Sequence, residues 1–247
     1  MTFDAHPRSS LIVALDFDSL PTALKFAQKI SDLVGMFKIG SQLFSSAGPE
    51  AVKQIAALGN SIFLDLKFHD IPNTVAGAVL SSAAMPGVQL VNVHALGGTA
   101  MLEAAVQAVS AGVPMGADRT RLIAVTILTS MDHKAMREAG IAGTPLSQAV
   151  KLARLAKTCG VDGVVASVQE GKAIRKACGR EFLIVTPGVR PEEKSAGKKK
   201  DDQARTATPA QAIKAGADYI VVGRPIIAAE DPRAAAQAIV EEIASAK

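Results

Sequence analysis

The sequence lacks tryptophan altogether and contains one tyrosine and eight phenylalanines among 247 residues. Hydrophobic residues still make up 49% of the chain, which is enough for a sizeable core. That core must be built mainly from Ala, Val, Ile and Leu. Such side chains suit parallel strands that are buried on both faces and the helices that cover them.

Cysteine and long apolar runs are equally scarce. The two cysteines, Cys159 and Cys178, fall in helix-like segments and have no partner at metal-ligand spacing, which predicts a reduced, cytoplasmic chain. No apolar run approaches the roughly 18 residues that a membrane-crossing helix needs. Residues 1–10 contain no apolar stretch typical of a signal peptide. We therefore expect no membrane partner.

The histidines and the charge balance narrow the choice of ligand. His6, His69, His94 and His133 are scattered without metal-binding spacing, so no metal site is expected. The formal net charge is +4, and part of it lies in Lys198–Lys200, which we expect to be a solvated loop tip. A basic balance can indicate nucleic acid. Because basic residues do not cluster with aromatic ones, we expect a small anionic substrate and no nucleic-acid partner.

Short apolar strands alternate with amphipathic helical stretches eight times along the chain. This alternation predicts parallel strands, and eight units of roughly 30 residues predict an α/β fold, a closed (β/α)8 TIM barrel. We expect one domain over residues 1–247, with residues 1–10 as an N-terminal extension. A doubly wound open sheet is the alternative, but no Gly-x-Gly-x-x-Gly follows the first strand. The expected strands are Leu11–Asp16, Met36–Gly40, Ser61–Lys67, Leu90–Ala95, Arg121–Leu128, Gly163–Ser167, Phe182–Gly188 and Tyr219–Arg224. The expected helices are Ala23–Val34, Gly48–Leu58, Thr74–Ala84, Thr99–Ser110, Leu146–Cys159, Gln169–Cys178, Thr208–Ala215 and Pro232–Ala246.

The most informative stretch is Phe63–Thr74, which places two acids and a lysine within six residues directly after an apolar strand. Side chains alternate between the faces of a strand, so Asp65 and Lys67 share one face. Charges on the inward face of a strand are costly to bury unless they pair or react. The pattern Asp-x-Lys-x-x-Asp, completed by Asp70, therefore indicates a site, although an ion pair that merely caps the strand would give the same pattern.

Polar side chains gather at the ends of the other expected strands as well. In a TIM barrel the chemistry lies at the carboxyl ends of the strands. Gly223 and Arg224 end the eighth expected strand and offer a backbone N–H and a bidentate guanidinium, which is typical of phosphate sites near strands seven and eight. The remaining strand ends contribute Asp16, Lys38, Asn92, His94, Thr126, Thr129 and Arg190.

Most of these residues lie in motifs that resemble those of the orotidine 5′-phosphate decarboxylase family, in the same order along the chain. The resemblance covers essentially the whole chain after residue ten, and the Asp-x-Lys-x-x-Asp box with Ile-Pro-Asn-Thr is highly specific. The lysine-rich insert before Asp202 is the one departure. The matching motifs are Leu15-Asp16-Phe17, Phe37-Lys38-Ile39-Gly40, Asp65 to Thr74, Leu128-Thr129-Ser130, Pro187-Gly188-Val189-Arg190-Pro191, Asp202-Gln203-Ala204-Arg205, Thr208-Pro209 and Val222-Gly223-Arg224-Pro225.

The resemblance implies an enzyme, a carboxy-lyase that converts orotidine 5′-phosphate to UMP and CO2 in pyrimidine biosynthesis. It implies that no metal or organic cofactor takes part and that the enzyme is a homodimer with shared active sites. Lys38, Asp65, Lys67 and Asp70 would form a catalytic charged array, with Asp70 and Thr74 contributed by the neighbouring subunit. The remaining implied contacts are Asp16 and Lys38 to the ribose, Thr129 to the pyrimidine, and Arg190, Gln203, Gly223 and Arg224 on the phosphate side.

Other functions remain open at this point. The nearest is a related barrel enzyme with a similar Asp-x-Lys box, a 3-keto-gulonate 6-phosphate decarboxylase or hexulose-phosphate synthase, which would depend on Mg²⁺. Lys38, the Ile-Pro-Asn-Thr extension and Asp202-Gln203 favour the orotidylate reaction over these. From other functional classes, the chain could be a catalytically silent phosphate-binding barrel or a basic RNA-binding protein.

Overall fold

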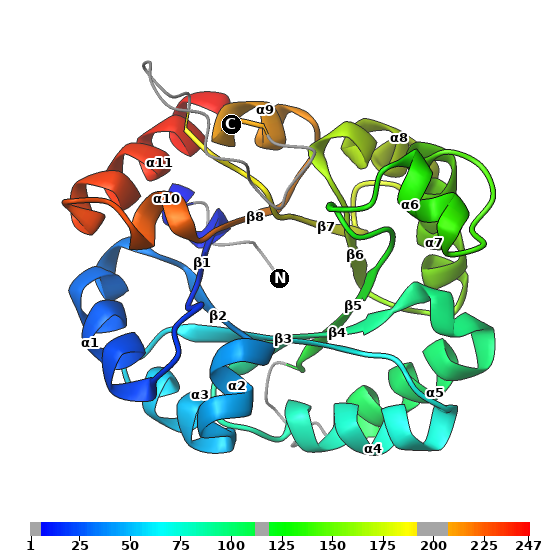
Figure 1. The fold of residues 1–247 in the computed structure, drawn as a ribbon, viewed down its shortest axis with the longest axis horizontal. Coiled ribbons are helices and arrows are strands. Elements are labelled where there is room, and N and C mark those ends of the chain that lie inside the picture. The colour runs from blue at the N-terminus through cyan, green and yellow to red at the C-terminus, as the bar shows by residue number, and fades with distance from the viewer. Residues whose placement is uncertain (1–5, 112–118, 192–206) are drawn as a thin grey trace.

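Eight parallel strands form a closed barrel in which each strand pairs with its neighbours in chain order and β8 pairs back to β1. The computed structural model describes residues 6–111, 119–191 and 207–247. Looking down the barrel, the strands form the inner ring and the helices the outer ring (Figure 1). The predicted (β/α)8 fold is therefore confirmed. The strands are β1 (Leu11–Ala14), β2 (Met36–Gly40), β3 (Ser61–Phe68), β4 (Val88–His94), β5 (Arg121–Val125), β6 (Gly163–Val165), β7 (Leu183–Thr186) and β8 (Tyr219–Val222).

The helices match the predicted segments, with three short additions. The predicted helices correspond to α1 (Leu20–Ile30), α3 (Pro49–Ala56), α4 (Pro72–Ala83), α5 (Gly98–Ala111), α7 (Pro145–Thr158), α8 (Val168–Cys178), α9 (Pro209–Lys214) and α11 (Pro232–Ala246). The sequence did not predict α2 (Ser41–Ala47), α6 (His133–Glu138) or α10 (Arg224–Ile227). Three 3₁₀ turns complete the described elements: η1 (Pro7–Ser10), η2 (Ser31–Leu33) and η3 (Ala95–Gly97). The expected solvated tip Lys198–Lys200 lies outside the described residues.

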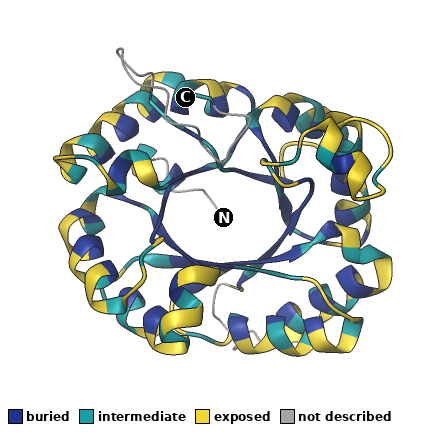
Figure 2. Cartoon of the chain, viewed as in Figure 1, coloured by how far each residue is buried: buried dark blue, intermediate teal, exposed yellow. Residues whose placement is uncertain are grey.

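Two layers of aliphatic side chains hold the barrel together. One apolar cluster fills its interior and includes Ile12, Met36, Phe63, Ile123 and Val185. A much larger cluster lies between the strands and the surrounding helices. Figure 2 shows the strand ring mostly buried, while the helices are buried toward the ring and exposed outward. The core is thus dominated by Ala, Val, Ile and Leu, as the composition predicts.

Local sequence signals set where several helices begin. Thr144, Ser167 and Thr208 each form a capping box with the residue three positions later. In α7 and α9 a proline directly follows the cap, where its missing N–H leaves no hydrogen bond unmade. These starts fix how each helix returns across the outside of the barrel.

The pairing of β3 with β4 is irregular near the carboxyl end of the barrel. Leu64 pairs with Val91 and Phe68 pairs with Val93, so residues 65–67 lie opposite the single residue Asn92. Lys67 has a φ of 52°, the one positive value at a non-glycine residue in the described part of the chain. Such a bulge bends a strand and redirects its side chains. It lies at the Asp-x-Lys-x-x-Asp box.

No helix within residues 6–111, 119–191 and 207–247 is long and apolar enough to cross a membrane.

Candidate active site

A hollow of about 540 Å³ opens at the carboxyl ends of the strands. Along each strand, alternation carries the inward face from the apolar interior up to this hollow, for example from Met36 to Lys38 and from Phe63 to Asp65. The predicted site residues that line it are Asp16, Lys38, Asp65, Lys67, Thr129, Arg190, Gly223 and Arg224. The structure thus brings together eight of the eleven residues to which the family resemblance assigns a role.

A buried carboxylate between two lysines forms the floor of the hollow. The Nζ atom of Lys67 lies 2.6 Å from Oδ1 of Asp65, and the Nζ atom of Lys38 lies 3.3 Å from Oδ2. Lys38 also lies 3.2 Å from Oδ1 of Asp16. Both oxygens of Asp65 therefore face an ammonium group. Asp65 and Lys67, which alternation predicts on one strand face, are in direct contact.

Burial and charge act in opposite directions on this array. Burial disfavours the ionised form of Asp65, but the ammonium groups of Lys38 and Lys67 outweigh that penalty and lower its pKa. Burial likewise opposes the charged form of Lys38, and the carboxylates of Asp65 and Asp16 overcome it and raise the pKa of Lys38. Asp65 and Lys38 are thus held ionised.

The glycine that ends β2 leaves room for this arrangement. A Cβ atom at Gly40 would lie 2.9 Å from the Nζ atom of Lys38, closer than side chains normally approach. The missing side chain allows Lys38 to extend between Asp16 and Asp65. The position of the Lys38 side chain therefore explains why the motif Phe37–Gly40 ends in glycine.

The opposite wall of the hollow carries hydrogen-bond donors suited to an anion. Arg190 follows β7, and its backbone N–H donates to the carbonyl of Ala207 at 2.9 Å. Gly223 and Arg224 follow β8. The sequence placed Arg224 at the end of the eighth strand, which was wrong, because β8 ends at Val222 and Arg224 begins α10. The chain turns at Gly223, and Arg224 still lines the hollow.

Two predicted residues do not line the hollow, and a third is not described. Asp70 and Thr74 are exposed on the segment after β3, and the Asp70 side chain accepts a hydrogen bond from the backbone N–H of Ile71 at 2.6 Å. Neither lines the hollow within this chain. Gln203 lies outside the described residues.

Two residues of the site were not assigned from the sequence. Gln42 lines the hollow from α2 and donates to Asp18 at 2.7 Å. Asn92 lies beneath the hollow on β4 and donates to Oδ1 of Asp65 at 2.6 Å. The sequence identified Asn92 only as a polar residue at the end of an expected strand, although an amide at an inward position of a buried strand must have partners. Gln42 has no such signal.

The acidic side chains here are arranged around a lysine. Among the described residues, no group of three or more His, Cys, Asp and Glu side chains is placed to hold a metal ion. The ammonium of Lys38 lies between Asp16 and Asp65, where a divalent cation would need their oxygens. The carboxylates therefore already have a positive partner from the chain itself.

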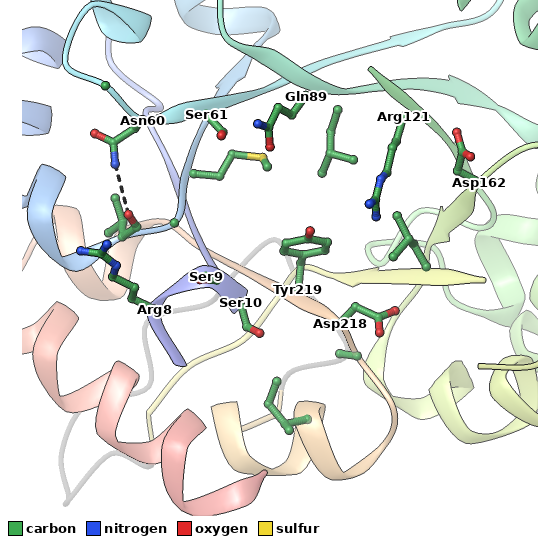
Figure 3. Close-up of a pocket in the computed structure, with 18 of the residues that line it drawn as sticks. Arg8, Ser9, Ser10, Asn60, Ser61, Gln89, Arg121, Asp162, Asp218 and Tyr219 are labelled. Carbon is green, nitrogen blue, oxygen red and sulfur yellow. Dashed lines mark hydrogen bonds between the residues drawn. The ribbon is translucent and has the colours of Figure 1, made fainter. Parts of the chain in front are cut away.

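A larger hollow of about 1320 Å³ lies at the opposite, amino-terminal end of the barrel, where Tyr219 of β8 and Arg121 of β5 contribute to its lining (Figure 3). Arg119 there forms a bidentate ion pair with Asp162. Asp162 also accepts from the backbone N–H of Leu122 at 2.8 Å, which ties this pair to the barrel wall. This ion pair therefore has a structural role at the base of the barrel, whereas catalysis in this fold takes place at the other end.

Comparison with known proteins agrees with this geometry. The family model for the orotidine 5′-phosphate decarboxylase / HUMPS family matches residues 9–239. The orotidine 5′-phosphate decarboxylase of Geotalea daltonii is 51% identical over 98% of this chain and 99% of its own length. That of Moorella thermoacetica is 50% identical over 98% of this chain and 95% of its own length. The crystal structure of the Lactobacillus acidophilus orotidine 5′-phosphate decarboxylase is 40% identical, covers 94% of this chain and 98% of that chain, and has a TM-score of 0.82. The chain therefore belongs to the orotidine 5′-phosphate decarboxylase / HUMPS family.

Proposed function

We propose that this protein converts orotidine 5′-phosphate to UMP and CO2 in de novo pyrimidine nucleotide biosynthesis. The observation that carries the proposal is the buried Asp65 carboxylate, which lies between the ammonium groups of Lys38 and Lys67 at the catalytic end of the barrel. The relatives named orotidine 5′-phosphate decarboxylase, about half identical over nearly the whole chain, support the same reaction.

The chemistry requires a positive group beside the reacting carbon. When the bond from C6 to the carboxylate breaks, CO2 leaves and the electron pair stays on C6 in the ring plane, where no π system delocalises it. An ammonium fixed beside C6 stabilises that charge as it develops and then transfers its proton to C6. We assign both roles to Lys67, so no metal or organic cofactor is needed.

Exposure distinguishes the two lysines. The Lys67 side chain is 37% exposed to the hollow, whereas that of Lys38 is 11% exposed and lies between two carboxylates. Lys67 is therefore the lysine that can reach a bound pyrimidine. Lys38 balances the buried charge and contacts the ribose together with Asp16. Asp65, held ionised, pairs with the Lys67 side chain and stands near the substrate carboxylate.

The other groups of the hollow hold the remainder of the substrate. Thr129 contacts the pyrimidine, and Arg190, Gln203, Gly223 and Arg224 bind the phosphate. At Gly223, even an added Cβ would find its nearest neighbours, Ala14 and Asp16, at 3.6 Å, so the backbone there is open to a ligand. Phosphate contacts far from C6 can supply binding energy that is used at the reacting carbon.

The active unit is a homodimer in which each site is completed by the neighbouring subunit. Asp70 and Thr74 are exposed and do not line the hollow of their own chain, and the adjacent Ile71 is 67% exposed. Leu80, farther along α4, is 42% exposed. Large apolar side chains in such positions favour a contact with another chain. We assign that contact to a second copy, which brings Asp70 next to Lys67 of its partner.

The test follows the loss of orotidine 5′-phosphate absorbance with purified, metal-stripped protein. We expect full turnover that EDTA does not reduce, with UMP as the product by chromatography. Turnover that requires added Mg²⁺ would favour the related sugar-phosphate enzymes of the same family. Absence of turnover with and without Mg²⁺ would refute the proposed reaction. A reaction of nucleotide biosynthesis is expected in the cytoplasm.

A further inference from the structure

Asn92 occupies an unusual place for an amide. It lies on β4 with its side chain directed into the barrel, and it is completely buried. Its strand neighbours Val91 and Val93 are also completely buried and belong to the outer apolar cluster. A buried amide is costly unless its donor and acceptor are both satisfied. The hydrogen-bond partners of Asn92 therefore indicate its role.

Both ends of the Asn92 amide bind the charged array. Its Oδ1 atom accepts from the backbone N–H of Lys67 at 2.8 Å, and its Nδ2 atom donates to Oδ1 of Asp65 at 2.6 Å. The Asn92 side chain thus contacts both the backbone of Lys67 and the carboxylate of Asp65. No apolar residue of similar size could make either bond.

The irregular pairing of β3 explains why such a bridge is needed. Residues 65–67 lie opposite Asn92 alone, so the regular exchange of backbone hydrogen bonds between the two strands is interrupted there. Lys67 adopts a left-handed backbone with a φ of 52°, which a side-chain-bearing residue adopts only when its surroundings hold it. The Asn92 side chain supplies the acceptor that a regular strand would have supplied to the Lys67 N–H.

The same amide also fixes the orientation of the Asp65 carboxylate. The Oδ1 atom of Asp65 accepts hydrogen bonds from Nδ2 of Asn92 and from Nζ of Lys67, while its Oδ2 atom lies near Nζ of Lys38. Rotation of the carboxylate would break the bond to Asn92. The amide therefore keeps the two lysines on separate oxygens.

We propose that Asn92 is a positioning residue for the decarboxylation, which fixes the Lys67 backbone and the Asp65 carboxylate at once. This inference rests on the proposed function of the site. Asn92 does not line the hollow, so it acts through Lys67 and Asp65 and not on the substrate. Displacements of about 1 Å in a catalytic group can lower a rate roughly 10²-fold.

The first test replaces Asn92 with leucine, which has similar volume and neither bond. We expect Asn92→Leu to lower kcat at least tenfold, while the Kd for UMP changes less than about threefold, because the phosphate wall is untouched. The matched control is Thr120→Val, which removes a buried hydrogen bond of 2.8 Å to the Val88 carbonyl at the other end of the barrel. This control should lower Tm and leave kcat per folded molecule unchanged.

The second test uses Asn92→Asp, which keeps the shape and can titrate. A protonated carboxyl at position 92 can donate a hydrogen bond to Asp65 and accept one from the Lys67 N–H, as the amide does. The ionised form instead repels the Asp65 carboxylate. The introduced group would face Asp65 and Lys67 of β3, with Lys38 of β2 beyond Asp65 and His94 two residues along β4. Burial and the Asp65 charge favour the protonated form as the pH falls. We expect kcat relative to the unmodified protein to rise at least tenfold between pH 8 and pH 5.

The outcomes separate this inference from the proposed function. An unmodified protein without decarboxylase activity would refute the proposed reaction itself. Where that protein is active, the positioning role is overturned if Asn92→Leu retains kcat within threefold per folded molecule. If Asn92→Leu does not fold, the isosteric Asn92→Asp decides: a pH profile parallel to that of the unmodified protein overturns the role.

Discussion

The backbone of Lys67 leads to a stability prediction whose sign is opposite to the usual one. At a φ of 52°, a residue with a Cβ atom pays a steric penalty of roughly 1–2 kcal/mol, while glycine adopts this region freely. We therefore compare Lys67→Gly with Lys67→Ala. Both variants lose the 2.6 Å contact to Asp65, so that loss cancels in the comparison.

The expected difference follows from two opposing effects. Relief of the left-handed strain favours the glycine variant, whereas the greater freedom of glycine in the unfolded chain disfavours it by about 0.4–1 kcal/mol. We expect Lys67→Gly to be more stable than Lys67→Ala by roughly 0.5–1 kcal/mol. At an ordinary strand position glycine is instead less stable than alanine by roughly 0.5–1 kcal/mol. Gln89 is exposed on β4, at a second irregularity of the β3–β4 pairing but without a positive φ, so its two variants provide a reference free of left-handed strain.

Urea unfolding of the four variants measures both differences. The reasoning requires opposite signs at the two positions, so it would be refuted if alanine were as stable as glycine or more stable at position 67. The same two Lys67 variants test catalysis. Removing one preorganised donor costs roughly 10²–10³ in rate, and loss of the proton donor adds to this. We expect both to lose at least about 10³ in kcat while still binding UMP. Retention of a tenth of the activity would contradict the role of Lys67.

Further predictions concern the phosphate wall, the buried carboxylate and the shared site. Arg224→Ala should lower kcat/KM for orotidine 5′-phosphate at least about tenfold, because a hydrogen bond to a charged group contributes roughly 1.5–3 kcal/mol. The same change should have little effect on kcat/KM for orotidine, which has no phosphate. Equal losses on both substrates would contradict phosphate binding by Arg224. The lowered pKa of Asp65 contributes stability that is present above about pH 4 and is lost as the pH falls through the folded value. The stability gap between the unmodified protein and Asp65→Asn should therefore narrow on acidification in urea titrations, and parallel curves would argue against it. Mixing Asp70→Ala with Lys67→Ala chains should restore activity, since a heterodimer has one site free of both changes; confirmed subunit exchange without restored activity would exclude a shared site.

The barrel was predictable because its strands and helices differ strongly in sequence pattern. Segments such as Met36–Gly40 and Pro232–Ala246 match the predicted bounds at both ends, since apolar runs and helical spacing set them. Most other strands were predicted to end too late, whereas β3 continues one residue beyond its predicted end, to Phe68. Tyr219–Arg224 shortens to Tyr219–Val222 because the chain turns at Gly223 and begins a helix. Periodicity does not distinguish the last residues of a strand from a turn that carries the ligand contacts.

The candidate site was predictable in composition but not in its internal geometry. Inward alternation places Asp16, Lys38 and Asp65 at one end of the barrel, so their proximity follows from the strand pattern. Which oxygen faces which lysine does not follow, because it depends on the left-handed turn at Lys67 and on the amide of Asn92. Both features arise from the interrupted pairing of β3 and β4, which no local sequence pattern encodes.

The different burial of Lys38, Asp65 and Lys67 explains the different roles that we propose for them. Asp65 and Lys38 are almost completely buried, so their charges must be matched within the protein, and each has the other within 3.3 Å. Lys67 keeps a third of its side chain open to the hollow while remaining 2.6 Å from the same carboxylate. A proton donor has to reach the substrate and yet stay in a fixed place beside the reacting carbon. Anchoring an accessible lysine to a buried, doubly paired carboxylate meets both requirements, because the anchor cannot turn away without leaving a buried charge unpaired.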